Sequence, residues 1–323
     1  MFRGACLLMA VAGLVFVSVA KTVLIPYEGY THSDPRLAAP LSSAGAALMV
    51  WNDQRPSGYN RSVHAAWVTD HLTLAPPGDF EVAGGLIYHE YRNPDVASGY
   101  GQCLVVWDNH RDQGAPPGPP DEIMGWFVYP TGPGPSGFYV QSGNWAKSLP
   151  AVAFEGSQYL VVWLGWREGY ARVYGARVLP NGTVLDPTGI PISTVGEAAL
   201  TPSVASAGGS SLVAWSASGQ IKGAFVDDIG TPHPAFPIES GLQSVGGPSV
   251  VYGDGLYYVS YVGSEQVFIC GSIRPGCGLR GRAMVSRSRH PAWSRRPLLD
   301  SACLRGSPCR DSGIDIGQGW PIL

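Results

Sequence analysis

The chain has 323 residues, with 43 Gly, 28 Pro and a formal net charge of −3 at pH 7. Its Gly and Pro content predicts a turn-rich fold without reaching the range of disordered chains, and a hydrophobic content of 45% is enough for a sizeable core. Helical patterns with apolar residues at i, i+3, i+4 and i+7 are absent beyond the N-terminus, which excludes the helical fold classes.

Residues 1–20 have the pattern of a secretory signal peptide. One Arg precedes an apolar run from Ala5 to Val17, and the small residues Ser18 and Ala20 precede Lys21. An uncleaved membrane anchor is the alternative, but the run is short for a full span. We therefore expect a secreted protein, extracellular or periplasmic, with no membrane span after cleavage.

Five weak repeats follow, and the clearest occupies residues 150–187. Each has a proline, then an apolar run that ends at an aromatic residue, then a small residue before another apolar run. The prolines are Pro40, Pro94, Pro150, Pro202 and Pro248. The aromatic residues are Trp51, Trp107, Trp163, Trp215 and Tyr261, and the small residues are Ala65, Gly125, Gly175, Gly223 and Gly281.

The spacing of these landmarks predicts an all-β fold, a β-propeller of about five four-stranded blades. The proline and the aromatic residue are 13 positions apart in four repeats, and each unit of about 50 residues has room for four short strands. We place the propeller at residues 21–300 and a short C-terminal tail at 301–323. Because an open sheet edge favours aggregation, we expect residues 22–27 to supply, or lie beside, the outer strand of the fifth blade.

The repeat resembles that of secreted bacterial proteins with predicted β-propeller folds. The shared pattern is W-x-D-x-R, then Y-G-x-R-V, then N-G-x-V-L-D, and it is seen at Trp51–Arg55, Trp107–Arg111 and Tyr174–Ser193. The resemblance covers residues 40–286 and implies the architecture, with almost no assignment of function. The Asp is missing from the third repeat, and both Asp and Arg are missing from the fourth and fifth.

Polar and aromatic residues after the apolar runs form the first candidate ligand site. These residues would lie on one rim of the propeller, where the aromatic rings could stack on sugars. In the alternative, each Asp caps its turn and each Arg pairs locally. We favour this structural role because the pattern is lost in adjacent repeats. The candidates are Asp53, Arg55, Asp108, Arg111, Trp166 and Arg167.

Catalytic signatures are weak. His89-Glu90 lacks a second His at the spacing of a zinc helix, and no G-x-S-x-G motif is present. A metal site at Asp108, His110 and Asp112 has no second cluster to support it, so we expect no metal and no cofactor. Propellers host glycoside hydrolases that use two or three carboxylates. The candidates of this kind are Asp53, Asp108, Glu122, Glu155 and Asp227.

Four of the cysteines fall within 40 residues, where a secreted protein keeps its disulfides. We prefer the pairs Cys270–Cys277 and Cys303–Cys309, and the other two connectivities stay open. Cys103 lies in a buried strand pattern and is expected to be a packed free thiol.

Charge is uneven along the chain, since nine Arg and a single acid lie between Arg274 and Arg310. This basic segment, with Arg287 and Arg289, could hold an anionic polymer or an acidic partner. We expect a monomeric, non-enzymatic binding or surface-interaction protein. Its ligand would be an extracellular polysaccharide or protein, not nucleic acid, bound at the rim or the basic fifth blade. The alternative is a carbohydrate-active hydrolase that uses rim carboxylates.

Overall fold

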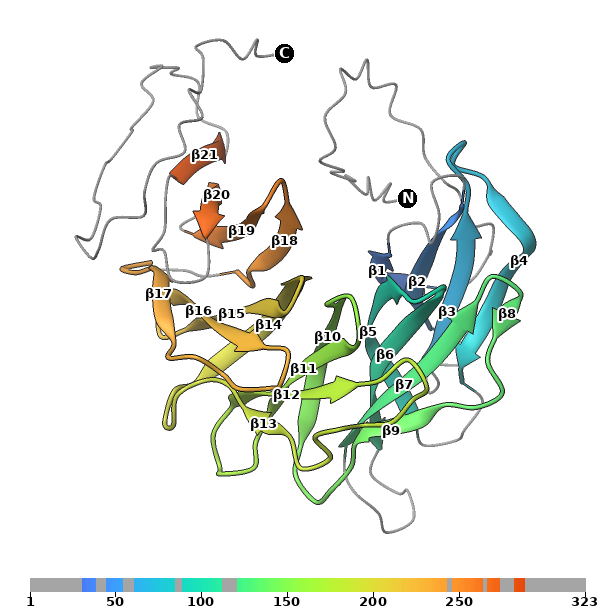
Figure 1. The fold of residues 1–323 in the computed structure, drawn as a ribbon, viewed down its shortest axis with the longest axis horizontal. Helices are drawn as coiled ribbons and strands as arrows, with labels where there is room; N and C mark the ends of the chain where they lie inside the picture. The colour runs from blue at the N-terminus through green and yellow to red at the C-terminus, as the bar shows by residue number, and fades with distance from the viewer. Residues whose placement is uncertain are drawn as a thin grey trace.

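A computed structural model describes residues 31–38, 45–54, 61–84, 89–111, 121–242, 246–263, 266–273 and 282–287, the last two ranges as backbone only. All regular elements within these ranges are strands. They form five antiparallel sheets that follow one another around a common centre (Figure 1). The predicted all-β propeller of about five blades is confirmed.

The first three blades hold thirteen strands. The first blade contains β1 (Thr31–Leu37), β2 (Ala47–Gln54), β3 (Arg61–Val68) and β4 (Leu74–Ala83). The second contains β5 (His89–Gly99), β6 (Gln102–Arg111), β7 (Asp121–Tyr129), β8 (Gly132–Pro133) and β9 (Phe138–Gln141), and both β8 and β9 pair with β7. The third contains β10 (Lys147–Phe154), β11 (Tyr159–Gly165), β12 (Arg172–Val178) and β13 (Ile190–Pro191).

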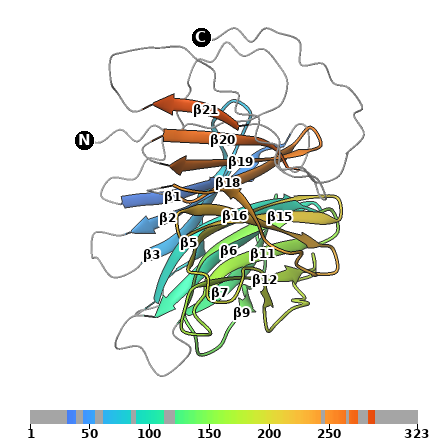
Figure 2. The ribbon, with the colours of Figure 1, turned by 90° about the vertical axis from the view of Figure 1, so that its left-hand side faces the viewer.

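The last two blades hold eight strands. The fourth contains β14 (Ala199–Ala207), β15 (Ser210–Ala217), β16 (Gln220–Asp227) and β17 (Phe236–Glu239). The fifth contains β18 (Ser249–Gly253), β19 (Leu256–Gly263), β20 (Gln266–Ile273) and β21 (Arg282–Arg287). Figure 2 shows these four strands side by side in chain order. In Figure 1 the first strand of each blade lies nearest the centre.

The core lies between successive blades and covers both faces of the second strand in the second, third and fourth blades. Residues 103–107 of β6 and 159–164 of β11 are unbroken apolar runs, as expected of strands buried on two sides. The aromatic landmarks all end such runs. Trp107, Trp163 and Trp215 are buried, and Trp51 and Tyr261 occupy the same place in the first and fifth blades.

In the first four repeats the small residue lies directly opposite the residue before the aromatic landmark. Gly125 pairs with Val106, and Gly175 pairs with Val162. A side chain from the outermost strand of the blade, or from next to it, covers the glycine. A Cβ at Gly175 would therefore meet Cδ1 of Ile192, which directly follows β13, at 2.9 Å. Close approach of the outer strand, not an unusual backbone conformation, therefore explains this landmark.

Two repeat landmarks differ from the sequence prediction. In the first blade Pro35 has the place of Pro94, directly after a residue with positive φ at a register shift in the first strand. Pro40 lies outside the described residues. In the fifth blade the third strand is β20, not the segment after Gly281, because β20 pairs with both β19 and β21.

Several predictions fall outside the described residues: the signal peptide at 1–20, the strand at 22–27 and the tail at 301–323. The fifth sheet has four strands from its own repeat, so it does not need 22–27 for an outer strand. Cys103 is a buried free thiol, as predicted. Of the proposed disulfide cysteines, Cys270 is on β20 with only its backbone described, and Cys277, Cys303 and Cys309 lie outside. In the part of the chain that is described, no helix has the length and apolarity to cross a membrane.

Candidate functional site

Ionisable side chains gather at one end of the first three blades, which we call the charged end. At this end the first strand of each blade begins, the second ends and the third begins. The opposite end, which carries the turns between first and second strands, is called the turn end. Antiparallel pairing within each sheet brings these strand ends together.

Each of the first four inner strands begins with a kinked pair, a residue with positive φ followed by proline. Asn93 has φ 51° and Leu149 has φ 53°, and the strand register shifts at both. Polar side chains of the preceding blade accept hydrogen bonds from these kinks. Asn52 Oδ1 accepts from the Asn93 N–H at 3.0 Å, and Asp108 Oδ1 accepts from the Leu149 N–H at 3.2 Å. Asn52 therefore connects the first blade to the second, and Asp108 connects the second to the third.

Three carboxylates form a row on the face of the second blade that packs against the third, which we call the carboxylate row: Glu90, Asp108 and Asp95. Arg92 lies opposite Asp108 across β5 and β6, and its guanidinium contacts both Asp108 Oδ2 (3.3 Å) and Glu90 Oε2 (3.7 Å). Asp95 lies opposite Val106, two positions before Asp108 on β6. Glu90 and Asp95 are thus diagonal neighbours of Asp108, at roughly 7–8 Å in such sheets.

The members of the row differ in exposure. The Asp108 side chain is fully buried, and burial raises its pKa even though Asn93 Nδ2 and Arg92 donate hydrogen bonds to it. The Asp95 side chain is 19% exposed. Burial raises the pKa of Asp95 to about 6, against the lowering effects of the Val152 N–H at 2.8 Å and of Arg36 at 3.9 Å. The row therefore combines Asp95, whose pKa is raised to about 6, with Glu90, whose carboxylate faces a guanidinium.

A second pair lies beside the row. His110, opposite Glu90 across the strands, forms a hydrogen bond with Asp121 through Nδ1 at 2.5 Å. Lys147 is buried next to this pair, and its ammonium donates to the carbonyl oxygens of Asp121, Gly143 and Trp145. Burial lowers the pKa of Lys147 to about 8. These contacts fix the start of β7 and β10 around the row.

The first blade carries a separate group of ionisable side chains, on the face that points away from the second blade. Asp53 lies 3.4 Å from His32 and 3.6 Å from His64, and His64 lies 3.7 Å from Asp79. Trp51 packs against both imidazoles. Of the described residues, no three metal-ligating side chains converge on one point.

The structure separates residues that the sequence placed together. Asp108 directly follows its tryptophan, whereas Asp53 is two positions after Trp51, so the two carboxylates point to opposite faces of their sheets. The residue equivalent to Asp108 in the first blade is Asn52. Glu155 and Asp227 lie at the turn end, away from the charged end.

The other predicted residues are scattered along the charged end. Arg111 ends β6, and Trp166 and Arg167 directly follow β11, where Arg167 donates to the Thr188 carbonyl oxygen at 3.4 Å. Arg287 is the last residue of β21, where only the backbone is described, and Arg55 and Arg289 lie outside the described residues.

Sequence reasoning missed Arg92, Asp95 and the position of Glu90 in the row. Asn93 and Pro94 mark the kink that turns Arg92 and Asp95 to one face, and an X-Pro pair before a strand is the only signal for it. The partner of His110 was also hidden, because Asp121 lies 11 residues further along the chain.

Comparisons with known proteins show the fold. No protein-family model and no curated protein matches the chain. Among solved structures it resembles a neuraminidase-like protein of A/flat-faced bat/Peru, with a TM-score of 0.51 and 9% identity over 81% of this chain and 76% of that one. A neuraminidase-like protein of A/little yellow-shouldered bat/Guatemala gives a TM-score of 0.50 and 9% identity over 80% of this chain and 85% of that one. The Hadza microbial sialidase Hz136 gives a TM-score of 0.49 and 12% identity. The match covers 76% of this chain and 51% of that protein.

These likenesses correct the prediction of a non-enzymatic binding propeller. That prediction is contradicted, because the solved structures that match with TM-scores of 0.50 and 0.51 are described as neuraminidase-like proteins. The prediction rested on the loss of the W-x-D-x-R pattern in adjacent repeats. A catalytic group needs carboxylates in one blade only, so that loss had no bearing on enzyme activity.

Proposed function

We propose that the chain is a carbohydrate-active hydrolase that cleaves glycosidic bonds at the carboxylate row. The observation that carries the proposal is the row itself: carboxylates in different environments, on neighbouring strands, beside a guanidinium. Glycosidases use carboxyl groups whose surroundings drive their pKa values apart. The likeness in fold to neuraminidase-like proteins supports the same class of reaction.

Exposure and pKa assign a role to each member. Asp95 is the general acid, because its side chain is partly exposed and burial raises its pKa to about 6. Glu90 is the general base, because its carboxylate is partly exposed and is held 3.7 Å from the Arg92 guanidinium. Asp108 is a positioning residue, since its buried carboxylate holds Arg92 and Asn93 and does not reach the substrate.

The reaction balances with one water. Asp95 gives its proton to the glycosidic oxygen as the bond to the anomeric carbon breaks, and Glu90 takes a proton from the water whose oxygen attacks that carbon. Asp95 and Glu90 are not direct neighbours, because Asp108 lies between them. Direct attack of water in this step, with no covalent intermediate, inverts the configuration at the anomeric carbon.

Secretion and a monomeric state remain part of this proposal. The N-terminal pattern of a signal peptide supports export, where a polysaccharide is the accessible substrate. The predicted disulfide pairs among Cys270, Cys277, Cys303 and Cys309 would be stable in that setting.

A substrate panel tests the proposal. The purified chain is incubated with neutral and anionic polysaccharides, and reducing ends are followed over time. The variant Asp95→Asn keeps an acceptor for the Val152 N–H but removes the acid, so it should lose 10²- to 10⁴-fold in rate. Glu168→Gln, a change to an exposed carboxylate after β11, is the control. If no substrate releases reducing ends, or if Asp95→Asn is as fast as the natural chain, the proposal fails.

A further inference from the structure

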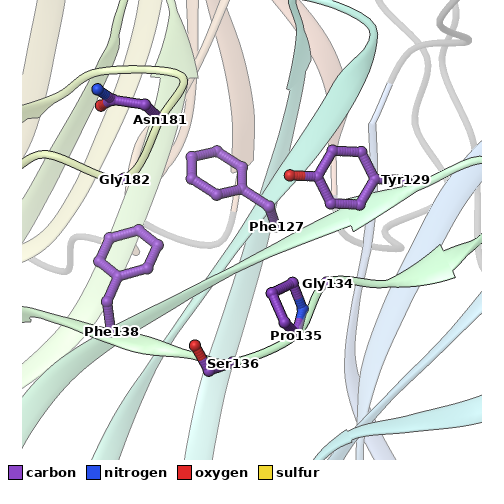
Figure 3. A pocket seen from close by; sticks show the side chains of 8 residues that line it. All are labelled: Phe127, Tyr129, Gly134, Pro135, Ser136, Phe138, Asn181 and Gly182. Atoms are coloured by element: carbon purple, nitrogen blue, oxygen red, sulfur yellow. The ribbon is translucent and has the colours of Figure 1, made fainter.

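Two adjoining pockets lie at the turn end, where the second and third blades meet, and together they are called the groove. One has a volume of about 250 Å³ and is lined by the aromatic side chains Phe127, Tyr129 and Phe138 (Figure 3). The other, of about 420 Å³, is lined by Tyr100, Gln102 and Ser157. Asn181 lines both, so they meet at the turn that joins β12 to β13. The charged end plays no part in this surface.

Tyr100 is an unusual residue for its position. It occupies the turn between β5 and β6 with φ 56°, and the following Gly101 has φ 76°. The equivalent turns of the fourth and fifth blades carry Gly208 and Asp254, which tolerate a left-handed backbone much better than tyrosine. The Tyr100 side chain is also 76% exposed, so packing does not account for it. An exposed ring held at a backbone cost points to a contact with a ligand.

The middle of the groove is held in place by hydrogen bonds. Gln102 Nε2 donates to the Pro180 carbonyl oxygen of the next blade at 2.7 Å. Within the turn, the Gly182 N–H donates to the Leu179 carbonyl oxygen at 2.9 Å, and Asn181 Oδ1 accepts from the Thr183 N–H at 3.0 Å. The groove is therefore formed before any ligand binds, which limits the entropy lost on binding.

The residues that line the groove decide the class of ligand. None of them carries a charge, in contrast to the charged end. They offer flat aromatic faces together with hydroxyl and amide groups from Ser136, Ser157 and Asn181. Aromatic faces bind the C–H faces of sugar rings, and amides and hydroxyls bind their hydroxyl groups. An uncharged lining gives no counter-charge to an anionic sugar.

We infer that the groove is a second carbohydrate site, which binds a neutral polysaccharide chain across the blade 2–blade 3 seam without cleaving it. Tyr100 stacks on one sugar ring, and the aromatic pocket around Phe138 takes another. This site does not depend on the proposed hydrolysis, because it lies at the opposite end of the blades. It would keep the protein on an insoluble substrate.

Retention on insoluble polysaccharides tests the site. The full chain carrying Glu90→Gln, so that turnover does not release it, is mixed with insoluble cellulose, xylan and starch, and with calcium polygalacturonate as the anionic comparison. We expect retention on at least one neutral polymer. Tyr100→Asn, which suits the left-handed turn better, should weaken it about tenfold while the melting temperature stays the same or rises.

Tyr139→Asn is the matched control, a second exposed tyrosine of the same blade, 55% exposed and outside both pockets. It should leave retention unchanged. No retention on any neutral polymer, retention on polygalacturonate alone, or equal retention by the Tyr100→Asn variant would overturn the inference. In the chain that keeps Glu90, hydrolysis of a short soluble substrate should be the same with and without Tyr100→Asn. This result separates the groove from the carboxylate row.

Discussion

The buried carboxylate of Asp108 accepts a hydrogen bond from the backbone N–H of Leu149, which is 41 residues further along the chain and in the next blade. Asn52 makes the same contact one blade earlier, with Asn93. The third blade has Leu164 at this place, which has no side-chain acceptor, so its seam with the fourth blade lacks this contact. These two seams lie on either side of the second blade, which carries the carboxylate row. A change that weakens the contact should therefore affect both the stability of the fold and the position of the row.

Removing this contact should cost stability. In Asp108→Ala the Leu149 N–H and the Asn93 amide lose their acceptor inside the protein, so we expect a loss of about 1–3 kcal/mol in the free energy of unfolding. Asp108→Asn keeps an acceptor for Leu149 and should cost less. Urea unfolding of both variants measures the difference. An equal cost for the two variants would show that the hydrogen bond to Leu149 does not stabilise the seam.

The close approach between Gly175 and Ile192 can be tested by changing both residues, singly and together. A Cβ there meets Ile192 Cδ1 at 2.9 Å, so Gly175→Ala should destabilise the chain by about 1–3 kcal/mol. Ile192→Val removes the methyl group in question, and the double variant should recover part of the loss. The coupling is read from a double-mutant cycle of thermal or urea unfolding. Strict additivity would mean that the strain lies elsewhere.

Asp95 should make stability depend on pH. Its pKa is about 6 in the folded chain and close to 3.9 in an unfolded one. The folded state therefore binds more protons between these values, and stability falls as pH rises from about 4 through about 6, by about 2–3 kcal/mol at most. The natural chain and Asp95→Asn are compared by urea unfolding from pH 4 to pH 7. Parallel curves would contradict the raised pKa.

The same pKa fixes the pH dependence of hydrolysis. The general acid must be protonated, so the rate should fall about tenfold per unit above pH 6. The proposed direct attack by water, with no covalent intermediate, further predicts inversion at the anomeric carbon. Proton NMR of the first product distinguishes the anomers before they interconvert. A product with retained configuration would exclude the assigned roles of Glu90 and Asp95.

Much of the architecture could be predicted from the sequence, because buried second strands need unbroken apolar runs and each ends in a large aromatic residue. Val162 and Trp163 show this pattern plainly. The site could not be predicted in the same way. Which side chains meet depends on register, and the kinks at Asn93 and Leu149 shift it by an amount that the sequence does not reveal.

The two aspartates show the consequence most clearly. Asp53 and Asp108 match the same repeat pattern, but they differ by one position from their tryptophans, and one position in a strand reverses the face. Asp95 was missed because nothing in its local sequence sets it apart. Its raised pKa comes from burial against the third blade, a contact between residues far apart in the chain.

The most direct test of the account is the rate at which Glu90→Gln releases reducing ends from the polysaccharide that the natural chain cleaves. The change keeps the shape of the side chain and removes the charge that activates water. The account predicts a loss of 10²- to 10⁴-fold in rate with folding unchanged, while Glu122→Gln, a change to the carboxylate bound to Asn109 on the other face of the blade, costs far less. A Glu90→Gln variant that hydrolyses as fast as the natural chain would contradict the proposed role of the carboxylate row.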